Sequence, residues 1–197
     1  MSKVVAVVGS YRRGGNTDSV VEAILDGARE KGAETHTIHL IERPIEFCTN
    51  CRQCTQTAGE ERGKCMQQDG LEALLAEIDA ADAVVLGSPV NCGNVTAVFR
   101  RFMERLIGGG RWPWGQPSPK IRKMRPGRKA VLVATSAMPG FLIPIATGTA
   151  NALRMTARLL GVKPVGKLWI GLSAQEPHHA LSVRNRERAR RLGWKLA

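Results

Sequence analysis

The sequence predicts an α/β protein in which a parallel sheet of five strands carries helices on both faces. Three short runs of apolar residues, at 4–8, 83–87 and 130–134, are continuous and rich in valine. Such runs are typical of strands that are covered on both faces. A segment with apolar residues at helical spacing follows each run. This alternation indicates parallel strands joined by right-handed crossovers.

Weaker elements complete the alternation. Residues 35–40 and 165–172 are predicted as the second and fifth strands. Asn16 or Thr17 caps the start of the first helix, and Gly32 fits its C-terminal cap. The helices are predicted, in chain order, over residues 20–28, 71–78, 95–106, 144–160 and 182–195, the last of them strongly basic.

Length and composition indicate a single domain spanning 1–197. A chain of 197 residues can bury most of its apolar surface in one core. Hydrophobic residues make up 43% and charged residues 23%, which argues against disorder. The domain carries a cysteine-bearing loop at 46–69 and a basic loop at 108–128, expected on the surface as a lid or an oligomer contact. The apolar run at 4–8 is too short for a signal peptide or a membrane span, so a cytoplasmic location is expected.

The chain is strongly basic, with 29 Lys and Arg against 17 Asp and Glu and a formal net charge of +12. Cations cluster at 120–129 and 184–191. Aromatic residues make up only 5%, and neither an RRM nor a helix-turn-helix pattern is visible. The charge therefore indicates a solvated basic face or the steering of phosphorylated ligands, and nucleic acid is not the expected partner.

The loop between the first strand and the first helix has the composition of a phosphate site. Its residues are Ser10, Tyr11, Arg12, Arg13, Gly14, Gly15, Asn16 and Thr17. Hydroxyls, an amide and two arginines gather where a helix N-terminus offers unpaired N–H groups and the positive end of its dipole. The loop lacks the G-x-G-x-x-G spacing and the Gly-Lys-Ser/Thr ending of a P-loop. A mononucleotide phosphate is the expected ligand, and a polar turn is the alternative.

Three loops are expected to meet at one end of the sheet. In the strand order 2-1-3-4-5, ligands bind outside the carboxyl ends of the strands, at the switch point between the first and third strands. The loops 10–17, 88–94 and 135–140 would converge there. The second loop offers a proline-fixed turn and bare backbone N–H groups, which suit the edge of a flat heterocycle. The third loop would close the opposite side.

The motifs in these loops resemble those of the NADPH-dependent FMN reductase group of flavodoxin-like proteins. The resemblance is carried by Gly9-Ser-x-Arg-x-x-Gly-Asn-Thr, by Gly87-Ser-Pro-Val, and by Gly93-Asn-Val-Thr-Ala before a Phe-rich helix. It covers residues 1–140 well and weakens beyond them. It implies a flavodoxin-like fold, non-covalently bound FMN, and a homodimer or homotetramer with the site near the interface.

By position, the resemblance assigns the FMN phosphate to the first loop and the isoalloxazine ring to the other two. The phosphate residues would be Ser10, Arg12, Asn16 and Thr17, and the ring residues Pro89, Val90, Asn91, Cys92, Gly93, Asn94, Ser136 and Gly140. No side chain is required as a catalytic base, because the flavin performs the hydride chemistry. Electrons would pass from NAD(P)H through FMN to flavin, quinone or another small acceptor.

One departure from the family pattern concerns the flavin ring. Members often carry an aromatic residue after the Pro-Val of the second loop, where this chain has Asn91 and Cys92. Either the ring is more open to a substrate, or Trp112, Trp114 or Phe141 covers it from another segment or subunit. Cys92 is expected to be a small apolar filler, with a redox role as the alternative.

Four cysteines on one loop raise the question of a metal centre. Cys48, Cys51 and Cys54 follow C-x2-C-x2-C spacing, and Cys65 lies further along. This spacing is closer to ferredoxin-type iron-sulfur ligation than to a zinc ribbon, and the resemblance includes iron-sulfur flavoproteins with such a motif. The gap to Cys65 is longer than in the compact motif, and no proline follows. A 4Fe-4S cluster, a zinc ion and free or reversibly oxidised thiols therefore stay open.

The leading hypothesis is an FMN-dependent NAD(P)H oxidoreductase. The alternatives are an iron-sulfur flavoprotein that carries electrons between proteins, and a redox sensor that binds a partner through its basic face. Adjacent His178 and His179 are expected to be solvated, although His178 could reach a nucleotide or a neighbouring subunit. His36 and His39, which flank the second strand, are weaker candidates.

Overall fold

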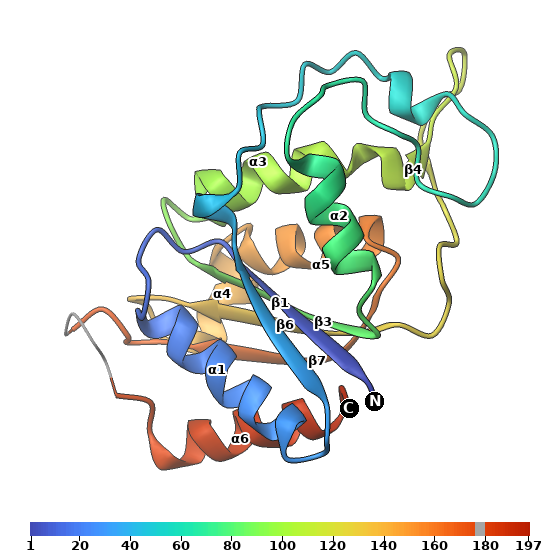
Figure 1. Ribbon diagram of the computed structural model, residues 1–197. Helices are drawn as coiled ribbons and strands as arrows, with labels where there is room; N and C mark the ends of the chain where they lie inside the picture. Colours follow the sequence, from blue (N-terminus) through green and yellow to red (C-terminus); the bar gives the residue numbers. More distant parts are fainter. Residues whose placement is uncertain (176–179) are drawn as a thin grey trace.

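One parallel sheet forms the centre of the computed structural model, which describes residues 1–175 and 180–197 (Figure 1). Five strands run in the spatial order β2-β1-β3-β6-β7. Their bounds are β1 Lys3–Val8, β2 Glu34–His39, β3 Ala83–Pro89, β6 Lys129–Thr135 and β7 Lys163–Ile170. Counted within the sheet, this is the order 2-1-3-4-5, so the predicted flavodoxin-like topology is confirmed.

Helices cover both faces of the sheet, as predicted (Figure 1). One face carries α1 (Asn16–Arg29) and α6 (Val183–Trp194), and the other carries α2 (Leu71–Asp79), α3 (Ala97–Arg105) and α5 (Thr149–Leu159). Successive residues of a strand point to opposite faces. In β1, Val5 and Val7 pack under α2 and α3, whereas Val4 and Val8 pack under α1. Since both sets are fully buried, the strand must be apolar throughout.

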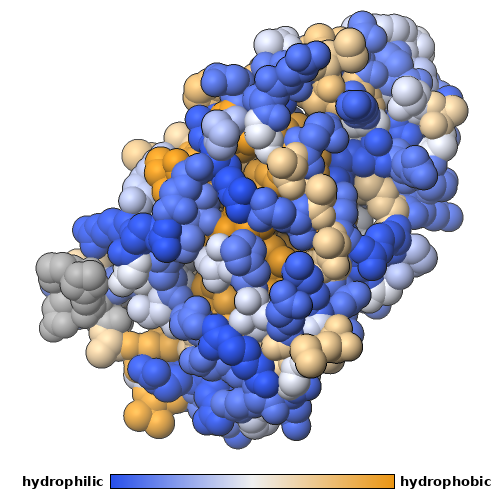
Figure 2. Space-filling model, in the orientation of Figure 1, coloured by the Kyte–Doolittle hydropathy of each residue, from blue (hydrophilic) through white to orange (hydrophobic). Residues whose placement is uncertain are grey.

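The basic residues of α6 stay on the surface. Arg184, Arg186 and Arg188 are exposed, and hydrophilic side chains predominate over the face that α1 and α6 form (Figure 2). This agrees with a solvated basic face. Among the helices that the structure describes, none combines the length and the apolar character that a membrane span requires.

α1 and α6 approach each other through two glycines. A Cβ added to Gly27 would stand 2.1 Å from the carbonyl oxygen of Arg190. One added to Gly193 would stand 2.0 Å from the carbonyl oxygen of Ile24. Both separations are far shorter than a van der Waals contact, so the helices can pack this closely only where both positions lack a side chain.

Replacing Gly27 by alanine should therefore push the two helices apart. We expect the free energy of unfolding to fall by about 1–3 kcal/mol, the usual cost of overpacking. The better helix propensity of alanine offsets at most about 1 kcal/mol of this loss. Urea denaturation measures the change, and Gly193→Ala should act in the same direction. Unchanged unfolding midpoints in both variants would contradict the close packing.

One predicted helix is divided in the structure. Residues 144–160 are predicted as one helix, but α4 (Ile143–Ala146) ends before α5 begins. At the break, Gly148 N–H donates to the carbonyl oxygen of Gly93 at 2.8 Å. A Cβ on Gly148 would stand 2.6 Å from Asn94 Nδ2. The helix is interrupted because the second loop packs against the break, a contact that helical periodicity does not reveal.

A smaller part of the molecule is formed by residues 46–69 and 108–128, which we call the cysteine lobe. The two segments lie side by side at one end of the molecule (Figure 1). They include the antiparallel ribbon of β4 (Gly110–Arg111) and β5 (Lys120–Ile121). The basic loop, expected as a lid or an oligomer contact, thus packs against the cysteine-bearing loop.

Two arginines hold the cysteine lobe together. The buried Arg122 donates hydrogen bonds to carbonyl groups of the lobe, those of Thr57, Gly59 and Gly108. The guanidinium of Arg52 lies 3.7 Å from the ring centroid of Trp112 and 4.1 Å from that of Trp114. These cation–π contacts join the cysteine motif to the basic loop.

Candidate functional site

A cavity of about 490 Å³ opens at the carboxyl ends of the strands. The three predicted loops meet there, and a fourth loop, which follows β7, joins them. The lining residues are Ser10, Tyr11, Arg12, Gly15, Asn16, Thr17, Pro89, Val90, Asn91, Thr135, Ser136, Ala137, Ser173, Ala174 and Gln175. Most of the residues predicted for the phosphate and the ring are therefore brought together at the expected switch point.

The first loop places the N-terminus of α1 against this cavity. Gly15 holds the N-cap position in extended backbone, with φ −79° and ψ −174°, and has no side chain to accept from the first N–H groups. The helix dipole and its N–H groups therefore favour an anion there. Ser10 Oγ accepts from Arg12 N–H at 3.1 Å, which tightens the turn. The exposed Arg12 side chain adds positive charge, so this set of donors fits a phosphate.

Two polar contacts tie the first loop to its neighbours. The hydroxyl of buried Thr17 lies 2.7 Å from the hydroxyl of Thr135, at the end of β6. The side-chain amide of Asn16 donates to the carbonyl oxygen of Ser173 in the fourth loop. Asn16 and Thr17, two of the four side chains that we predicted as phosphate ligands, thus also hold the walls of the cavity together.

The second loop contributes backbone and a proline to the cavity. Residues 89–91 line it. At the end of this segment the chain turns: Asn91 and Asn94 exchange backbone hydrogen bonds of 2.8 and 2.9 Å, and Cys92 and Gly93 between them have positive φ. This tight turn carries Cys92, Gly93 and Asn94 away from the lining of the described cavity. Cys92 is exposed, so the expectation of a buried filler is not met.

The third loop enters the cavity through Ser136 and Ala137. Ser136 is fixed, because its N–H donates to the carbonyl oxygen of Ile170 at 2.9 Å and its Oγ accepts from Met138 N–H at 3.1 Å. Gly140, which we predicted at the ring, is not among the described lining residues. It packs against the backbone of β7, where a Cβ would stand 2.6 Å from the carbonyl oxygen of Trp169.

Sequence reasoning missed the fourth loop, residues 173–175, although a signal for it exists. This loop follows the fifth parallel strand. The carboxyl end of that strand lies at the same edge of the sheet as those of the strands before the other three loops, so the loop reaches the same cavity. Tyr11 was also not assigned a role. Its hydroxyl accepts from the N–H of Ala97, the first residue of α3, at 3.1 Å, and its side chain is half exposed.

Tyr11 is the aromatic residue of the described cavity lining. Trp112 and Trp114 stack on Arg52 in the cysteine lobe, and Phe141 is exposed beside the third loop. None of these three belongs to the described lining. Within this chain, an aromatic contact to a flat ligand in the cavity would therefore come from Tyr11.

The thiols of the cysteine lobe are close enough to influence one another. Burial, followed by the charges of Cys65, Cys48 and Cys51, raises the pKa of Cys54 to about 11. Within residues 1–175 and 180–197, no three His, Cys, Asp or Glu side chains are arranged to hold a metal ion. The histidine pair at 178–179 lies outside the described residues.

Arg105 anchors the cysteine lobe to α3. Its fully buried side chain donates to Asp69 Oδ2 at 2.6 Å and to Cys65 Sγ at 3.3 Å. Burial alone would raise the pKa of Asp69, but hydrogen bonds from Arg105 and from the N–H groups of Glu46 and Leu71 lower that pKa to about 2. The carboxylate is therefore ionised, and the ion pair fixes both ends of the cysteine-bearing loop.

Fold and site together define a class of protein: a flavodoxin-like domain that presents a helix N-terminus without a side-chain cap at the switch point of its sheet. A family model described as NADPH-dependent FMN reductase matches residues 2–173. The chain belongs to this family, which confirms the resemblance seen in the motifs of the first and second loops.

Two curated relatives of this chain are named iron-sulfur flavoprotein. An iron-sulfur flavoprotein of Archaeoglobus fulgidus is 33% identical over 111 residues, which are 56% of this chain and 48% of the relative. An iron-sulfur flavoprotein of Methanocaldococcus jannaschii is 36% identical over 103 residues, which are 52% of this chain and 51% of the relative. The chain thus spans about half the length of the curated relatives it matches.

Solved structures share the fold along the whole chain. An NAD(P)H:quinone oxidoreductase from Methanothermobacter marburgensis has a TM-score of 0.72 at 20% identity, covering 100% of this chain and 99% of its own. An FMN-dependent NADH-azoreductase from Bacillus anthracis in complex with FMN has a TM-score of 0.68 at 12% identity, covering 100% of both chains. At these identities the likeness concerns the fold alone.

Proposed function

We propose that this protein is an FMN-dependent oxidoreductase that takes electrons from NAD(P)H and passes them to a small acceptor such as free flavin or a quinone. The observation that carries the proposal is the cavity at the switch point, where the uncapped N-terminus of α1 and Arg12 face a space of about 490 Å³. Membership of the NADPH-dependent FMN reductase family supports the same function.

FMN, when bound, supplies the hydride and electron-transfer chemistry. The residues of the chain bind and orient it. The N-terminus of α1 and Arg12 hold the phosphate, and the rigid turn after Asn91 presents the second loop to the ring. Ser136 Oγ accepts from Met138 N–H, so its proton is available for donation to a carbonyl or nitrogen acceptor of the ring.

Flavin retention tests the proposal directly. The purified chain is mixed with excess FMN, desalted and examined for flavin absorbance, and NAD(P)H oxidation is then followed with flavin or a quinone as acceptor. We expect flavin to stay with the protein and NAD(P)H to be consumed. Protein that retains no flavin would sink the proposal, and retained flavin without NAD(P)H oxidation would reduce it to flavin binding.

Replacing Tyr11 by alanine should weaken FMN binding by about twofold to tenfold, since an aromatic stack contributes about 0.5–1.5 kcal/mol. It should also raise the fluorescence of the bound flavin, because the stacked ring is lost. Tyr11→Phe keeps the ring but loses the hydrogen bond from Ala97 N–H, so its affinity should stay within about twofold of the wild type. Equal affinities for all three proteins would remove Tyr11 from the flavin contact.

A second candidate function is electron transfer through an iron-sulfur cluster held by the cysteine lobe. The observation in its favour is that four free cysteines, Cys48, Cys51, Cys54 and Cys65, lie on this one lobe, near enough for the other three to add to the effect of burial on the pKa of Cys54. Four cysteines on one lobe supply the number and kind of ligand that a 4Fe-4S cluster needs, although within the described residues no three of them are arranged to hold a metal ion. The curated relatives named iron-sulfur flavoprotein match this chain over about half of their own length.

Anaerobic purification with iron and acid-labile sulfide analysis tests the cluster. Cys54→Ser should lose both iron and sulfide, whereas Cys92→Ser, which alters an exposed cysteine outside the lobe, should keep them. Wild-type protein without iron or sulfide would reject this second function and leave the flavin chemistry untouched.

We also propose that the chain assembles into a homodimer or a homotetramer. Phe141 and Ile145, beside the third loop, are 71% and 79% exposed although both are large apolar side chains. Neighbouring apolar exposure of this kind is typical of an interaction surface. Light scattering coupled to gel filtration measures the mass, and Ile145→Lys should shift it toward the monomer. A monomeric wild type would reject the proposal.

A further inference from the structure

A second cavity, of about 430 Å³, opens at the carboxyl end of β2, and we call it the β2 cavity. Its lining includes Arg13, Gly14, Asp18, Ser19, Thr37 and His39. The β2 cavity shares the first loop with the cavity of about 490 Å³ at the switch point, which we call the flavin cavity. Arg12 and Gly15 line the flavin cavity, whereas the two residues between them line the β2 cavity.

Two polar atoms at the β2 cavity have no hydrogen-bond partner among the described residues. They are His39 Nδ1 and Asp18 Oδ1, in side chains that are only 8% and 15% exposed. The two atoms lie 3.9 Å apart, which is too far for a direct hydrogen bond. An unpaired buried polar atom costs about 1–3 kcal/mol. Since native structures rarely leave such groups unpaired, the pair indicates a missing third group.

A single hydroxyl placed between the two atoms would satisfy both. It would accept a hydrogen bond from His39 Nδ1–H and donate one to Asp18 Oδ1. The other carboxylate oxygen, Asp18 Oδ2, already accepts from Gly14 N–H at 2.6 Å, so the carboxylate is held in place. The β2 cavity is far larger than one water molecule, and its polar lining suits a ligand with several hydroxyls.

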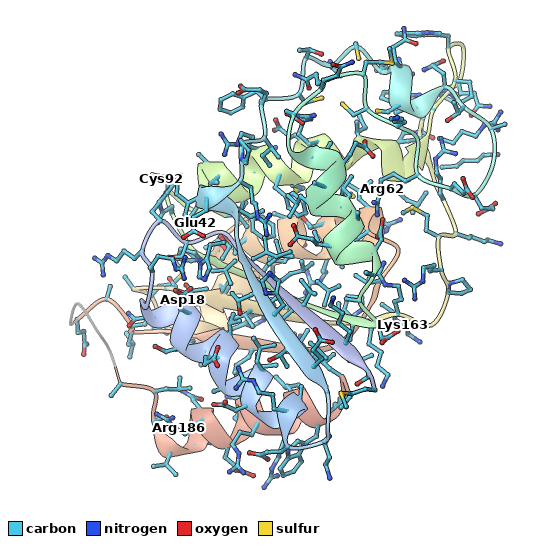
Figure 3. The ribbon with its side chains drawn as sticks, viewed as in Figure 1. Asp18, Glu42, Arg62, Cys92, Lys163 and Arg186 are labelled. Carbon is cyan, nitrogen blue, oxygen red and sulfur yellow. The ribbon has the colours of Figure 1, made fainter. Side chains whose placement is uncertain are left out.

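Arg13 is the cation of a lining that also holds the carboxylates of Asp18 and Glu22. Glu22 is engaged by Arg29. The side chain of Arg13 is 60% exposed and pairs with Glu42, which is itself 53% exposed. A surface pair of this kind is worth at most about 1 kcal/mol, so a phosphate can take the place of the carboxylate. Arginine binds phosphate through strong paired hydrogen bonds. Figure 3 shows Asp18 and Glu42 at the same end of the molecule.

The position of the β2 cavity indicates which ligand carries a hydroxyl and a phosphate together. β2 is the direct neighbour of β1, and the phosphate loop follows β1. In dinucleotide-binding α/β folds, phosphates lie at the first loop, an acidic residue nearby binds the adenosine ribose, and an arginine accommodates its 2′-phosphate. Asp18, on α1, and Arg13, in the first loop, bring the same two functional groups to the end of β2, while the first loop itself is assigned to the FMN phosphate.

We propose that the β2 cavity binds the adenosine ribose of NADPH, with a ribose hydroxyl between His39 and Asp18 and the 2′-phosphate on Arg13. The proposal rests on the proposed function, which supplies a nicotinamide dinucleotide as co-substrate. It adds a subsite for the half of that molecule that does not react.

Calorimetric titration of the FMN-saturated protein with 2′,5′-ADP tests the subsite. We expect saturable binding, and 5′-AMP, which lacks the 2′-phosphate, should bind about tenfold more weakly. Arg13→Gln should weaken 2′,5′-ADP about tenfold and leave 5′-AMP almost unchanged. His39→Gln should weaken both. His36→Gln is the matched control, because His36 lies on the same strand, is 52% exposed and pairs with Glu77 outside the cavity.

Absence of saturable 2′,5′-ADP binding to the wild type, unchanged binding in Arg13→Gln, or displacement of 2′,5′-ADP by excess FMN would each overturn the proposal. Arg13 is largely exposed, so its variant tests the subsite even if His39→Gln fails to fold. Protein that retains no FMN rejects the proposed function, and the same titration of flavin-free protein then judges the subsite separately.

Discussion

Replacing Gly15 by aspartate is expected to weaken FMN binding by about 100-fold or more, with no loss of fold stability. An aspartate at the N-cap accepts hydrogen bonds from the first N–H groups of α1, the groups that otherwise face the phosphate. Its charge would also repel the phosphate, because two like charges about 4 Å apart near a protein surface repel each other by about 4 kcal/mol. A loss of about 2.7 kcal/mol corresponds to 100-fold in affinity.

Fluorescence titration with FMN measures this change, and thermal unfolding measures stability. Helix capping by aspartate should keep the unfolding temperature of the flavin-free protein equal to or above that of the wild type. Gly15→Ala is the matched control, because the backbone there is extended and its Cβ would meet nothing closer than 3.3 Å. It should bind FMN nearly as well as the wild type. Unweakened binding by Gly15→Asp would mean that the phosphate lies elsewhere.

Replacing Arg105 by methionine is expected to lower the free energy of unfolding by about 3–5 kcal/mol, the usual cost of breaking a buried ion pair. The substitution leaves Asp69, which is only 9% exposed, without its cation. It also removes the contacts to Cys65 Sγ and to the carbonyl oxygen of Glu46. The cysteine lobe should therefore detach from α3 before the sheet unfolds.

Arg100→Met on the same helix is the matched control. Arg100 pairs with Glu104 at 3.0 Å, but both side chains are about half exposed. Such a surface pair contributes about 0.3–0.5 kcal/mol. Urea denaturation of both variants separates the two cases. Equal losses of stability would show that burial of the Arg105 pair is unimportant.

The Arg105–Asp69 pair also predicts how stability responds to acid. The pKa of Asp69 is about 2 in the folded protein and about 3.9 in an unfolded chain. A lowered pKa stabilises the fold above the unfolded value, and this contribution is lost as the pH falls through the folded value. The wild type should therefore lose stability between about pH 4 and pH 2, and Asp69→Asn should flatten this decline.

The three central strands could be predicted from the sequence because they are buried on both faces and must be apolar throughout, as 83–87 and 130–134 are. The edge strands β2 and β7 are partly exposed and polar, so their signal is weaker. The break at Gly148 could not be predicted. Its cause is the approach of Asn94, which is distant in sequence and leaves no mark on the local pattern. The packing of 108–128 on the cysteine-bearing loop could not be predicted for the same reason. Arg122 donates to carbonyl groups that are distant in sequence, such as that of Gly59.

The candidate site, too, could be predicted from the sequence only in part. The phosphate loop was visible because its hydroxyls, arginines and glycines lie in one stretch, 10–17, directly before a helix. Residues 92–94 and Gly140 were assigned by their place in a family motif, but backbone contacts keep them out of the described cavity lining. The burial of His39 depends on the packing of α1 beside β2, which no spacing reveals.

The contact of Arg52 with the rings of Trp112 and Trp114 gives the cysteine lobe an optical reporter of its own. The chain has four tryptophans, and the other two, Trp169 and Trp194, belong to β7 and α6. In a variant with phenylalanine at those two positions, indole emission would arise from the lobe alone. Opening of the lobe could then be timed against unfolding of the sheet.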